Sequence, residues 1–261
     1  MQPMASMALR AARLAGQKLV RAFDRPDIIK VSEKGHNDFV TNLDKEAEFL
    51  IIEALRVAFP THRFRGEEGT DTGENSSEYE WLIDPIDGTY NFVRNIPHFC
   101  ISVGCMHKGR LEHGVILDPM RQEEFVASRG AGCQLNGRRL RVSNTESLDG
   151  AALSTGGHEN ETAEQQASVY RELLNGGAKM RQAGSAALDL AYVAAGRLDG
   201  MWMRKLHLWD IAAGALMVTE AGGLIGDFDG SANYLKSGNI VAASPKTFKA
   251  LAPLVKRHLA G

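Results

Sequence analysis

The sequence predicts a mixed fold, with an α+β first half (residues 1–148) and an α/β second half (149–261) that form one compact unit. Helix-like apolar spacing and short apolar runs recur along all 261 residues. The apolar runs before residue 148 follow one another like antiparallel strands, whereas those after it alternate with helices. Hydrophobic residues make up 44% and charged residues 24%, which is ordinary for a globular chain.

Two helices are expected early in the chain. Residues 4–23 carry apolar side chains at helical spacing, which predicts an amphipathic first helix. Four basic residues precede the first acidic residue, Asp24, and a transit peptide would share that feature, but the helical spacing favours the helix. A second helix is expected from Thr41 to Phe59, because Thr41 and Asp44 fit a capping box.

Strand patterns dominate the rest of the first half. We expect strands at 62–65 and 80–84, an antiparallel meander at 99–107, 111–117 and 124–128, and a hairpin at 133–142. The turns of the meander are expected at Lys108-Gly109 and Asp118-Pro119. The polar stretch 69–78 is expected to be a mobile loop.

Strands and helices are expected to alternate in the second half. The strands are expected at 151–155, 201–203, 224–228 and 240–243, and the helices at 161–174, 185–195, 211–221 and 245–259.

Charge and cysteine content exclude several classes of protein. A net charge of −2 argues against direct nucleic-acid binding, which favours a basic face. No apolar run reaches the roughly 18 residues that a membrane span needs. The three cysteines include no CxxC pair, so we expect reduced thiols in a cytoplasmic protein.

Acidic residues are concentrated in one segment. Between Arg65 and Arg94 there are eight acids and no Lys or Arg. Most fit a solvated face, but Asp84 and Asp87 close an apolar strand that Pro85 is expected to end. Two carboxylates at the end of a buried strand repel each other unless a cation or a proton relieves them.

The residues after Asp84 fit a metal and phosphate site. The Ile86 carbonyl is free to point at the same spot, and Gly88 permits a tight bend. Thr89 can start a helical turn whose N–H groups would receive an anion. Hard oxygen ligands beside an anion site favour a Mg²⁺ phosphate-ester centre, and the alternative is an ordinary Asp-rich turn.

Several motifs together resemble one family. They are KG (34–35), DFVTNLD (38–44), GEE (66–68), WLIDPIDGTYNF (81–92), GSAALD (184–189), and LWDIAAG (208–214) followed by EAGG (220–223). This set, which spans nearly the whole chain, resembles the inositol monophosphatase family of Mg²⁺-dependent phosphatases, and within it the bacterial SuhB-type inositol-1-monophosphatases.

The resemblance implies a layered αβαβα sandwich, a homodimer, inhibition by Li⁺, and hydrolysis of inositol 1-phosphate to inositol and phosphate by metal-activated water. It implies two to three Mg²⁺ ions per active site. By this resemblance, one Mg²⁺ is held by Glu67, Asp84 and the Ile86 carbonyl, a second by Asp84, Asp87 and Asp210, and a weaker third lies near Glu67, with Lys34 near the outer metal. The attacking water is oriented by Glu67 and Thr89, and Asp44 orients Thr89. The phosphate is bound by the N–H groups of Gly88 and Thr89, and the alcohol by Asp87, Ala186 and Asp210.

Structural alternatives exist for some of these residues. Asp44 could serve only as a helix cap. Asp210 stands where any acid favours the helix dipole, although Trp209 and the EAGG match favour a ligand. Glu68 is expected to be a solvated or salt-bridged neighbour. His98 and His207 are expected to be structural, because metal-assisted hydrolysis needs no histidine.

Two positions depart from the family pattern. Tyr90 replaces a common Thr, a mild change. Met203 replaces the Glu that commonly bonds the inositol ring, and a thioether offers almost no hydrogen bonding. We therefore expect hydrolysis to be retained and inositol preference to be weakened, which leaves another sugar phosphate or a nucleotide phosphate as an alternative substrate.

A binding role is the alternative from another class. SuhB-type proteins are also associated with the transcription and ribosomal-RNA machinery as binding partners. The basic run 138–141 (RRLR) could serve such a role, although a solvated hairpin is the favoured explanation, because short charge clusters are common on surfaces.

Overall fold

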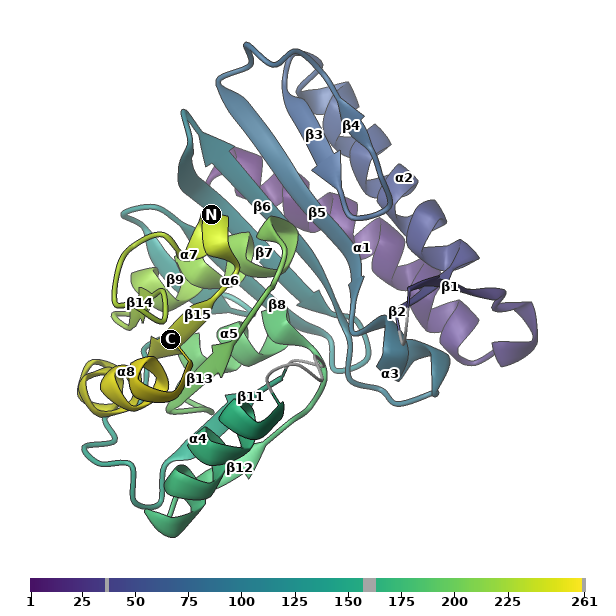
Figure 1. Cartoon of the computed structure of the whole chain (residues 1–261). Coiled ribbons are helices and arrows are strands. Elements are labelled where there is room, and N and C mark those ends of the chain that lie inside the picture. Colours follow the sequence, from purple (N-terminus) through teal and green to yellow (C-terminus); the bar gives the residue numbers. More distant parts are fainter. Residues whose placement is uncertain (36–37, 157–162, 260–261) are drawn as a thin grey trace.

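The expected layered fold is confirmed. The computed structural model describes residues 1–35, 38–156 and 163–259, without the side chains of 33–35 and 38. Two sheets and three helix layers alternate as αβαβα (Figure 1). The outer helices α1 (Pro3–Phe23) and α2 (Asn42–Ala58) cover the first sheet, α5 (Ala186–Ala194) and α6 (Leu208–Glu220) lie between the sheets, and α4 (Ala163–Asn175) and α8 (Pro245–Leu259) cover the second sheet.

The first sheet has eight strands in the order β10-β9-β8-β7-β6-β5-β3-β4. Their bounds are β3 Arg63–Gly66, β4 Asp71–Thr72, β5 Tyr79–Asp87, β6 Cys100–His107, β7 Arg110–Asp118, β8 Glu123–Ser128, β9 Gly132–Leu135 and β10 Arg138–Arg139. β3 and β5 are parallel and the other neighbours are antiparallel. The predicted meander and hairpin are therefore confirmed.

Two glycines let a central helix approach this sheet closely. Gly104 on β6 lies opposite Gly114 on β7. A Cβ at Gly104 would stand 2.7 Å from the Ala212 Cβ, and one at Gly114 would stand 2.8 Å from the Ala213 carbonyl oxygen. The backbone of α6 thus packs directly on the middle of the sheet, which sets the position of Asp210 at the start of the helix.

The second sheet has five strands in the order β12-β11-β13-β15-β14. Their bounds are β11 Ala152–Thr155, β12 Lys179–Arg181, β13 Gly200–Met203, β14 Leu224–Gly226 and β15 Ile240–Ala243. β12, β11 and β13 are parallel, and β15 and β14 complete the sheet in antiparallel fashion. The remaining elements are η1 (Pro26–Ile28), β1 (Val31–Gly35) paired with β2 (Asp38–Thr41), α3 (Thr89–Val93) and α7 (Tyr234–Ser237).

Apolar burial holds the layers together. One buried cluster lies between α1, α2 and the first sheet, a second surrounds α5 and α6, and a third joins the second sheet to α4 and α8. Fully buried side chains such as Phe64, Trp81 and Trp202 each contribute about 2–3 kcal/mol. The three cysteines are free and buried, as expected for structural thiols.

Some local predictions were wrong. β5 does not end at Pro85 but runs to Asp87, because the ladder shifts register between Asp84 and Asp87, and a bulge tolerates the missing N–H of proline. The stretch 69–78 contains a short strand, β4, held to β3 by an ion pair between Arg63 and Asp71. The sequence also gave no indication of β1, β2, β12 or α7.

The first helix is confirmed, with one face buried. The helix expected from 161 begins at Ala163 in the described residues, and 161–162 lie outside them. The strands of the two sheets lie on either side of residue 148, but the division into two halves remains a prediction. None of the described helices combines the length and apolar character needed to span a membrane.

Candidate active site

The bulge in β5 places two carboxylates at the edge of the first sheet. Asp84 lies opposite Ser102 and Asp87 opposite Cys100, with the irregularity between them. The Ile86 N–H donates to Asp84 Oδ1 at 3.0 Å, which closes the local turn. Asp84 is 2% and Asp87 8% exposed, so both carboxylates are withdrawn from bulk water.

Gly88 reverses the chain into the short helix α3. Its φ is +100°, and a Cβ there would stand 3.2 Å from both the Gly184 and His98 carbonyl oxygens, so only glycine fits. The turn brings Thr89 Oγ1 to 2.9 Å from the Ile86 carbonyl oxygen and 3.2 Å from Asp44 Oδ1. A hydroxyl, a carbonyl oxygen and a carboxylate are therefore brought together.

Asp44 does both of the things that the sequence left open. Its Oδ2 accepts from the Thr41 N–H at 2.7 Å, as part of the capping box of α2, while its Oδ1 lies against Thr89. Burial raises the pKa of Asp44 to about 6, against the hydrogen bonds from Thr41 and Thr89. Capping is thus not its only contact.

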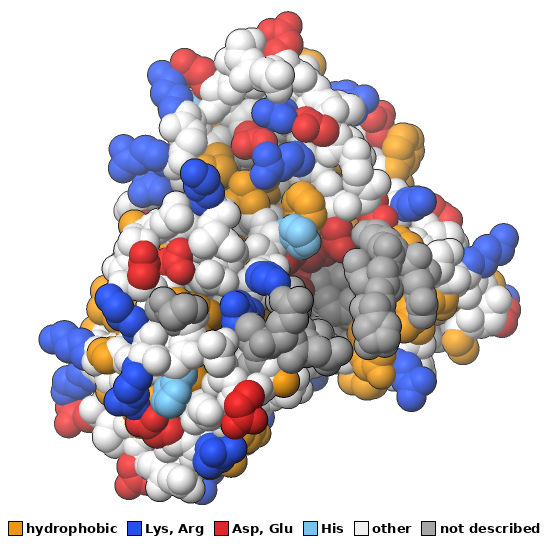
Figure 2. All heavy atoms as spheres, in the orientation of Figure 1, with side chains coloured by type: hydrophobic (Ala, Val, Ile, Leu, Met, Phe, Trp, Pro, Cys, Tyr) orange, Lys and Arg blue, Asp and Glu red, His pale blue; other side chains and the backbone are white. Residues whose placement is uncertain are grey.

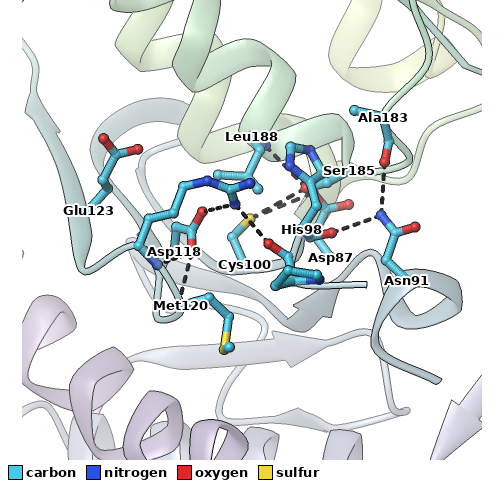
Figure 3. A network of polar contacts seen from close by, with 12 residues as sticks. Asp87, Asn91, His98, Cys100, Asp118, Met120, Glu123, Ala183, Ser185 and Leu188 are labelled. Carbon is cyan, nitrogen blue, oxygen red and sulfur yellow. Dashed lines mark hydrogen bonds and ion pairs between the residues drawn. The ribbon is translucent and has the colours of Figure 1, made fainter. Parts of the chain in front are cut away.

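Asp87 faces the N-terminus of α5. Figure 3 shows Asp87, Ser185 and Cys100 pointing toward one another. The Ser185 hydroxyl and the Ala187 N–H donate to Asp87 Oδ2, the latter at 2.8 Å, and the Ala186 N–H donates to Oδ1 at 3.3 Å. These donors and the helix dipole favour the carboxylate form, although burial, the larger influence, raises the pKa of Asp87.

Asn91 joins α3 to the turn before α5. Its Nδ2 donates to the His98 and Ala183 carbonyl oxygens, both at 2.8 Å (Figure 3). Sequence reasoning assigned no role to Asn91 or Ser185, which lie 94 positions apart along the chain. The sequence around Ser185 predicts the start of a helix, but it does not predict that the Ser185 hydroxyl contacts Asp87.

Asp210 stands in the first turn of α6. It accepts from the His207 N–H at 2.8 Å, and Ser102 Oγ donates to the Trp209 carbonyl oxygen at 3.1 Å, which ties the start of α6 to β6. Burial holds the pKa of Asp210 well above its usual range, and the charge of Asp87 raises it further.

Glu67 completes the acidic group from the turn after β3. Its backbone N–H donates to the Ile83 carbonyl oxygen at 3.1 Å, one residue before Asp84. Burial holds the pKa of Asp84 well above its usual range, and the charges of Glu67, Asp87 and Asp210 raise it further. The four acids predicted as metal ligands therefore lie close enough to influence one another. We call Glu67, Asp84, Asp87 and Asp210 the acidic cluster.

The acidic cluster offers only hard oxygen donors in a buried setting, which fits Mg²⁺. Within the described ranges no Lys or Arg side chain pairs with Asp84, Asp87 or Asp210. The described side chains also form no ready-made group of three or more metal-ligating residues. The carboxylates instead accept local N–H and O–H donors, so a cation would require them to turn toward a shared point.

The structure places the remaining predicted residues on α5, β13 and β1. Ala186 starts α5 beside Asp87. Met203 ends β13, is 4% exposed, and packs against Gly156, where a Cβ would stand 3.2 Å from its Cε. Lys34 lies on β1, and its side chain lies outside the described residues. Tyr90 is exposed, with its ring 5.8 Å from that of Phe39.

Other side chains near Asp210 were missed or given no role. Arg204 follows Met203, and its Nε and Nη1 atoms are buried without a hydrogen-bond partner among the described residues, as is Trp209 Nε1. His207 stacks on Trp209, with ring centroids 4.9 Å apart.

The backbone N–H of Glu68 donates to Glu48, a buried acid on α2 that sequence reasoning also missed. A second acid on the apolar face of the helix, one turn after Asp44, was the available signal.

Comparisons with known proteins agree on one family. The model of the inositol monophosphatase family matches residues 1–260. The Nus factor SuhB of Pseudomonas aeruginosa is 52% identical over 266 residues, covering 99% of this chain and 98% of that protein.

Solved structures agree with that match. The extragenic suppressor protein suhB of Bartonella henselae superposes with a TM-score of 0.96 at 36% identity, covering 99% of this chain and all of the other. The IMPase of Thermotoga maritima superposes with a TM-score of 0.89 at 33% identity, covering 98% and 97%.

Proposed function

The chain belongs to the inositol monophosphatase family, which makes it a phosphatase, and we propose that it is a Mg²⁺-dependent phosphomonoesterase acting on inositol 1-phosphate. The observation that carries this proposal is the acidic cluster, in which burial and like charge raise the pKa of Asp84 and Asp210. Asp84, Asp87 and Asp210 lie close together and pair with no Lys or Arg among the described side chains, which favours binding of a divalent cation.

Each residue of the site has a role in this proposal. Glu67, Asp84, the Ile86 carbonyl, Asp87 and Asp210 would hold two to three Mg²⁺ ions, with Lys34 near the outermost. Bound Mg²⁺ supplies Lewis-acid activation of water and neutralises phosphate charge. The Gly88 and Thr89 N–H groups, at the start of α3, bind the phosphate.

The chain itself orients the attacking water and the leaving alcohol. The single Thr89 hydroxyl proton has two acceptors within reach, the Ile86 carbonyl oxygen at 2.9 Å and Asp44 Oδ1 at 3.2 Å. Donation to either leaves the oxygen lone pairs of Thr89 free to accept from a water. Glu67 orients the same water from the other side. Asp87, Ala186 and Asp210 lie where the alcohol would bind, between the ends of β5, α5 and α6.

The test is phosphate release from inositol 1-phosphate across a Mg²⁺ titration, with and without Li⁺, beside a panel of sugar and nucleotide phosphates. We expect Mg²⁺-dependent, Li⁺-sensitive turnover of inositol 1-phosphate above the panel. Turnover of panel compounds but not of inositol 1-phosphate would show that the substrate is another phosphate ester. No turnover of any compound by folded protein would refute the phosphatase proposal. The mass of the same preparation in solution tests the predicted homodimer.

A second substrate class is supported by Met203 and Arg204. The apolar thioether of Met203 replaces an acceptor, and two guanidinium nitrogens of Arg204 are buried with no hydrogen-bond partner among the described residues. A sugar phosphate with a second anionic group would satisfy such donors. If position 203 reads the alcohol, Met203→Glu should lower KM for inositol 1-phosphate by about tenfold. An unchanged KM would show that position 203 does not contact the ring.

A second function is supported by the relatives named Nus factor. The chain would then also bind a protein of the transcription and ribosomal-RNA machinery in the cytoplasm. Arg138 and Arg139 form the exposed edge strand β10 and are candidates for that contact. Acidic and basic side chains are interspersed over the face in Figure 2, which favours a protein partner over direct nucleic-acid binding. Loss of RNA polymerase co-purification in Arg138→Ser/Arg139→Ser, with unchanged phosphatase activity, would support this role. No co-purification with the unaltered chain would refute it.

A further inference from the structure

A second buried carboxylate on α2 supports the turn that carries Glu67. Glu48 is 2% exposed and lies four residues after Asp44, on the same side of the helix. Its Oε2 accepts from the Glu68 N–H at 2.8 Å, and its Oε1 accepts from the Thr70 N–H at 3.3 Å and from the Thr70 hydroxyl. Hydrogen bonds to a carboxylate are about twice as strong as neutral ones.

The turn is built around this carboxylate. Gly66 donates its N–H to the Thr70 carbonyl oxygen at 2.8 Å, which closes the turn. A Cβ at Gly66 would stand 2.1 Å from Glu48 Oε2. The carboxylate therefore occupies the space that a side chain at position 66 would need. Glu48 can take this position only because residue 66 is a glycine.

The backbone of Glu67 is thus held from two sides. Its own N–H bonds to Ile83 on β5, and the next N–H bonds to Glu48 on α2. One turn earlier on α2, Asp44 contacts Thr89. The same helix face therefore supports the turn that carries Glu67 and the turn that carries Thr89.

We propose that Glu48 is a positioning residue that fixes Glu67 relative to Asp84 and Thr89 and thereby sets the affinity of the acidic cluster for Mg²⁺. The inference rests on the proposed function for its metal. Residues that support metal ligands commonly change metal affinity or activity by about 10- to 100-fold when they are removed.

Two measurements on Glu48→Gln test this. The first is the Mg²⁺ concentration that gives half-maximal phosphate release. The second is the Mg²⁺ concentration that raises the melting temperature by a fixed amount without substrate, which reports binding alone. We expect both concentrations to rise about tenfold or more, with a smaller change in kcat at saturating Mg²⁺. Glu53→Gln, which removes an exposed carboxylate from the same helix, is the control and should change neither concentration.

A double-mutant cycle sharpens the test. Gly66→Ala should displace the carboxylate and reproduce the Mg²⁺ effect of Glu48→Gln. In a Glu48→Ala background the same glycine change should have little further effect, because the two residues act through one contact. Additive effects would show that Gly66 acts independently of Glu48.

The outcomes separate this inference from the proposed function. A lowered melting temperature with an unchanged Mg²⁺ requirement in both assays would mean that Glu48 is only structural, and would overturn the inference. If Glu48→Gln does not fold, the same two measurements are made on Thr70→Val. The Mg²⁺ concentrations that it requires should rise about threefold, because one hydrogen bond to Glu48 is lost. Mg²⁺ stabilisation of an unaltered chain that hydrolyses no phosphomonoester would refute the function and leave the thermal test of Glu48 valid. An unaltered chain that Mg²⁺ does not stabilise would overturn the inference.

Discussion

Two buried acidic regions lie at the same edge of the first sheet and differ in how their charge is neutralised. Asp118 ends β7 and Asp87 ends β5, with β6 between them (Figure 3). Asp118 accepts from the Met120 and Arg121 N–H groups at 3.0 and 2.9 Å and from the Arg121 guanidinium at 2.8 Å. The charge of Asp118 is therefore neutralised by a side chain of the protein, the Arg121 guanidinium.

In the acidic cluster, by contrast, Asp84, Asp87 and Asp210 pair with no Lys or Arg among the described side chains. Its members instead raise the pKa of one another. The difference teaches that burial of an acid does not by itself indicate function. A buried acid paired with Arg121 stabilises the fold, whereas several buried acids that share one space favour an external cation.

The largest effect is expected from Asp84→Asn. Because Asp84 is predicted to contact both main Mg²⁺ ions, phosphate release should fall by about 10²–10³-fold or more. The melting temperature without Mg²⁺ should not fall, since one of several repelling charges is removed. Steady-state kinetics and thermal unfolding check both parts. An active Asp84→Asn protein would refute the role of the cluster.

The opposite pattern is expected from Asp118→Asn. Removing this carboxylate takes away the ion pair with Arg121, whose side chain is 43% exposed and keeps its bond to the Pro97 carbonyl oxygen. The change should therefore cost about 1.5–3 kcal/mol of unfolding free energy. The Mg²⁺ requirement of the remaining folded protein should be unchanged. Chemical denaturation measures the first effect, and a Mg²⁺ titration the second. A large shift in the Mg²⁺ requirement would show that Asp118 also affects Mg²⁺ binding, which would contradict the difference proposed between the two regions.

A third buried acid links stability to pH. Burial raises the pKa of Asp189 to about 7, and Ser154 Oγ, 2.6 Å away, is its hydrogen-bond donor. The folded state therefore holds this proton over a range where the unfolded state has lost it. The stability that this contributes is present below pH about 4 and is lost as the pH rises through about 7.

Asp189→Asn should remove that dependence. Relative to the unaltered chain, the variant should gain on the order of 3 kcal/mol in unfolding free energy between pH 4 and 7. Denaturation curves across this range for both proteins give the difference. Parallel pH profiles would show that Asp189 does not hold its proton in the folded state.

The smallest effect is expected at the far end of α6. Glu220 accepts from the Gly130 and Gly132 N–H groups, both at 2.8 Å, and so fixes the β8–β9 turn far along the helix from Asp210. Glu220→Gln keeps the shape but loses one of the two acceptors, which should cost about 1 kcal/mol. The Mg²⁺ requirement should not change. A changed requirement would mean that the helix transmits the disturbance to Asp210.

Local patterns predicted much of the fold. Helical spacing identified α1 and α2, and alternation with the Lys108-Gly109 turn identified the meander of the first sheet. β1 and β2, which pair with each other, were missed because they are short and show no regular apolar alternation. β12 was missed because it is a polar three-residue strand whose partner, β11, is distant in the chain. The order of strands in the second sheet depends on such distant pairing as well.

The candidate site shows the same limit. Single motifs bring Asp84, Asp87, Gly88 and Thr89 together, and a family resemblance adds Glu67 and Asp210. The contacts between Asp87 and Ser185 and between Glu48 and Glu68 join residues 98 and 20 positions apart. Spacing within a motif contains no information on such pairs.

The central claim is that a divalent cation neutralises the acidic cluster, and calorimetric Mg²⁺ titration tests it most directly. We predict saturable binding of two or more ions to the unaltered chain and to Asp118→Asn, and loss of at least one ion from Asp84→Asn. Equal binding by Asp84→Asn, or no binding by the unaltered chain, would contradict the account.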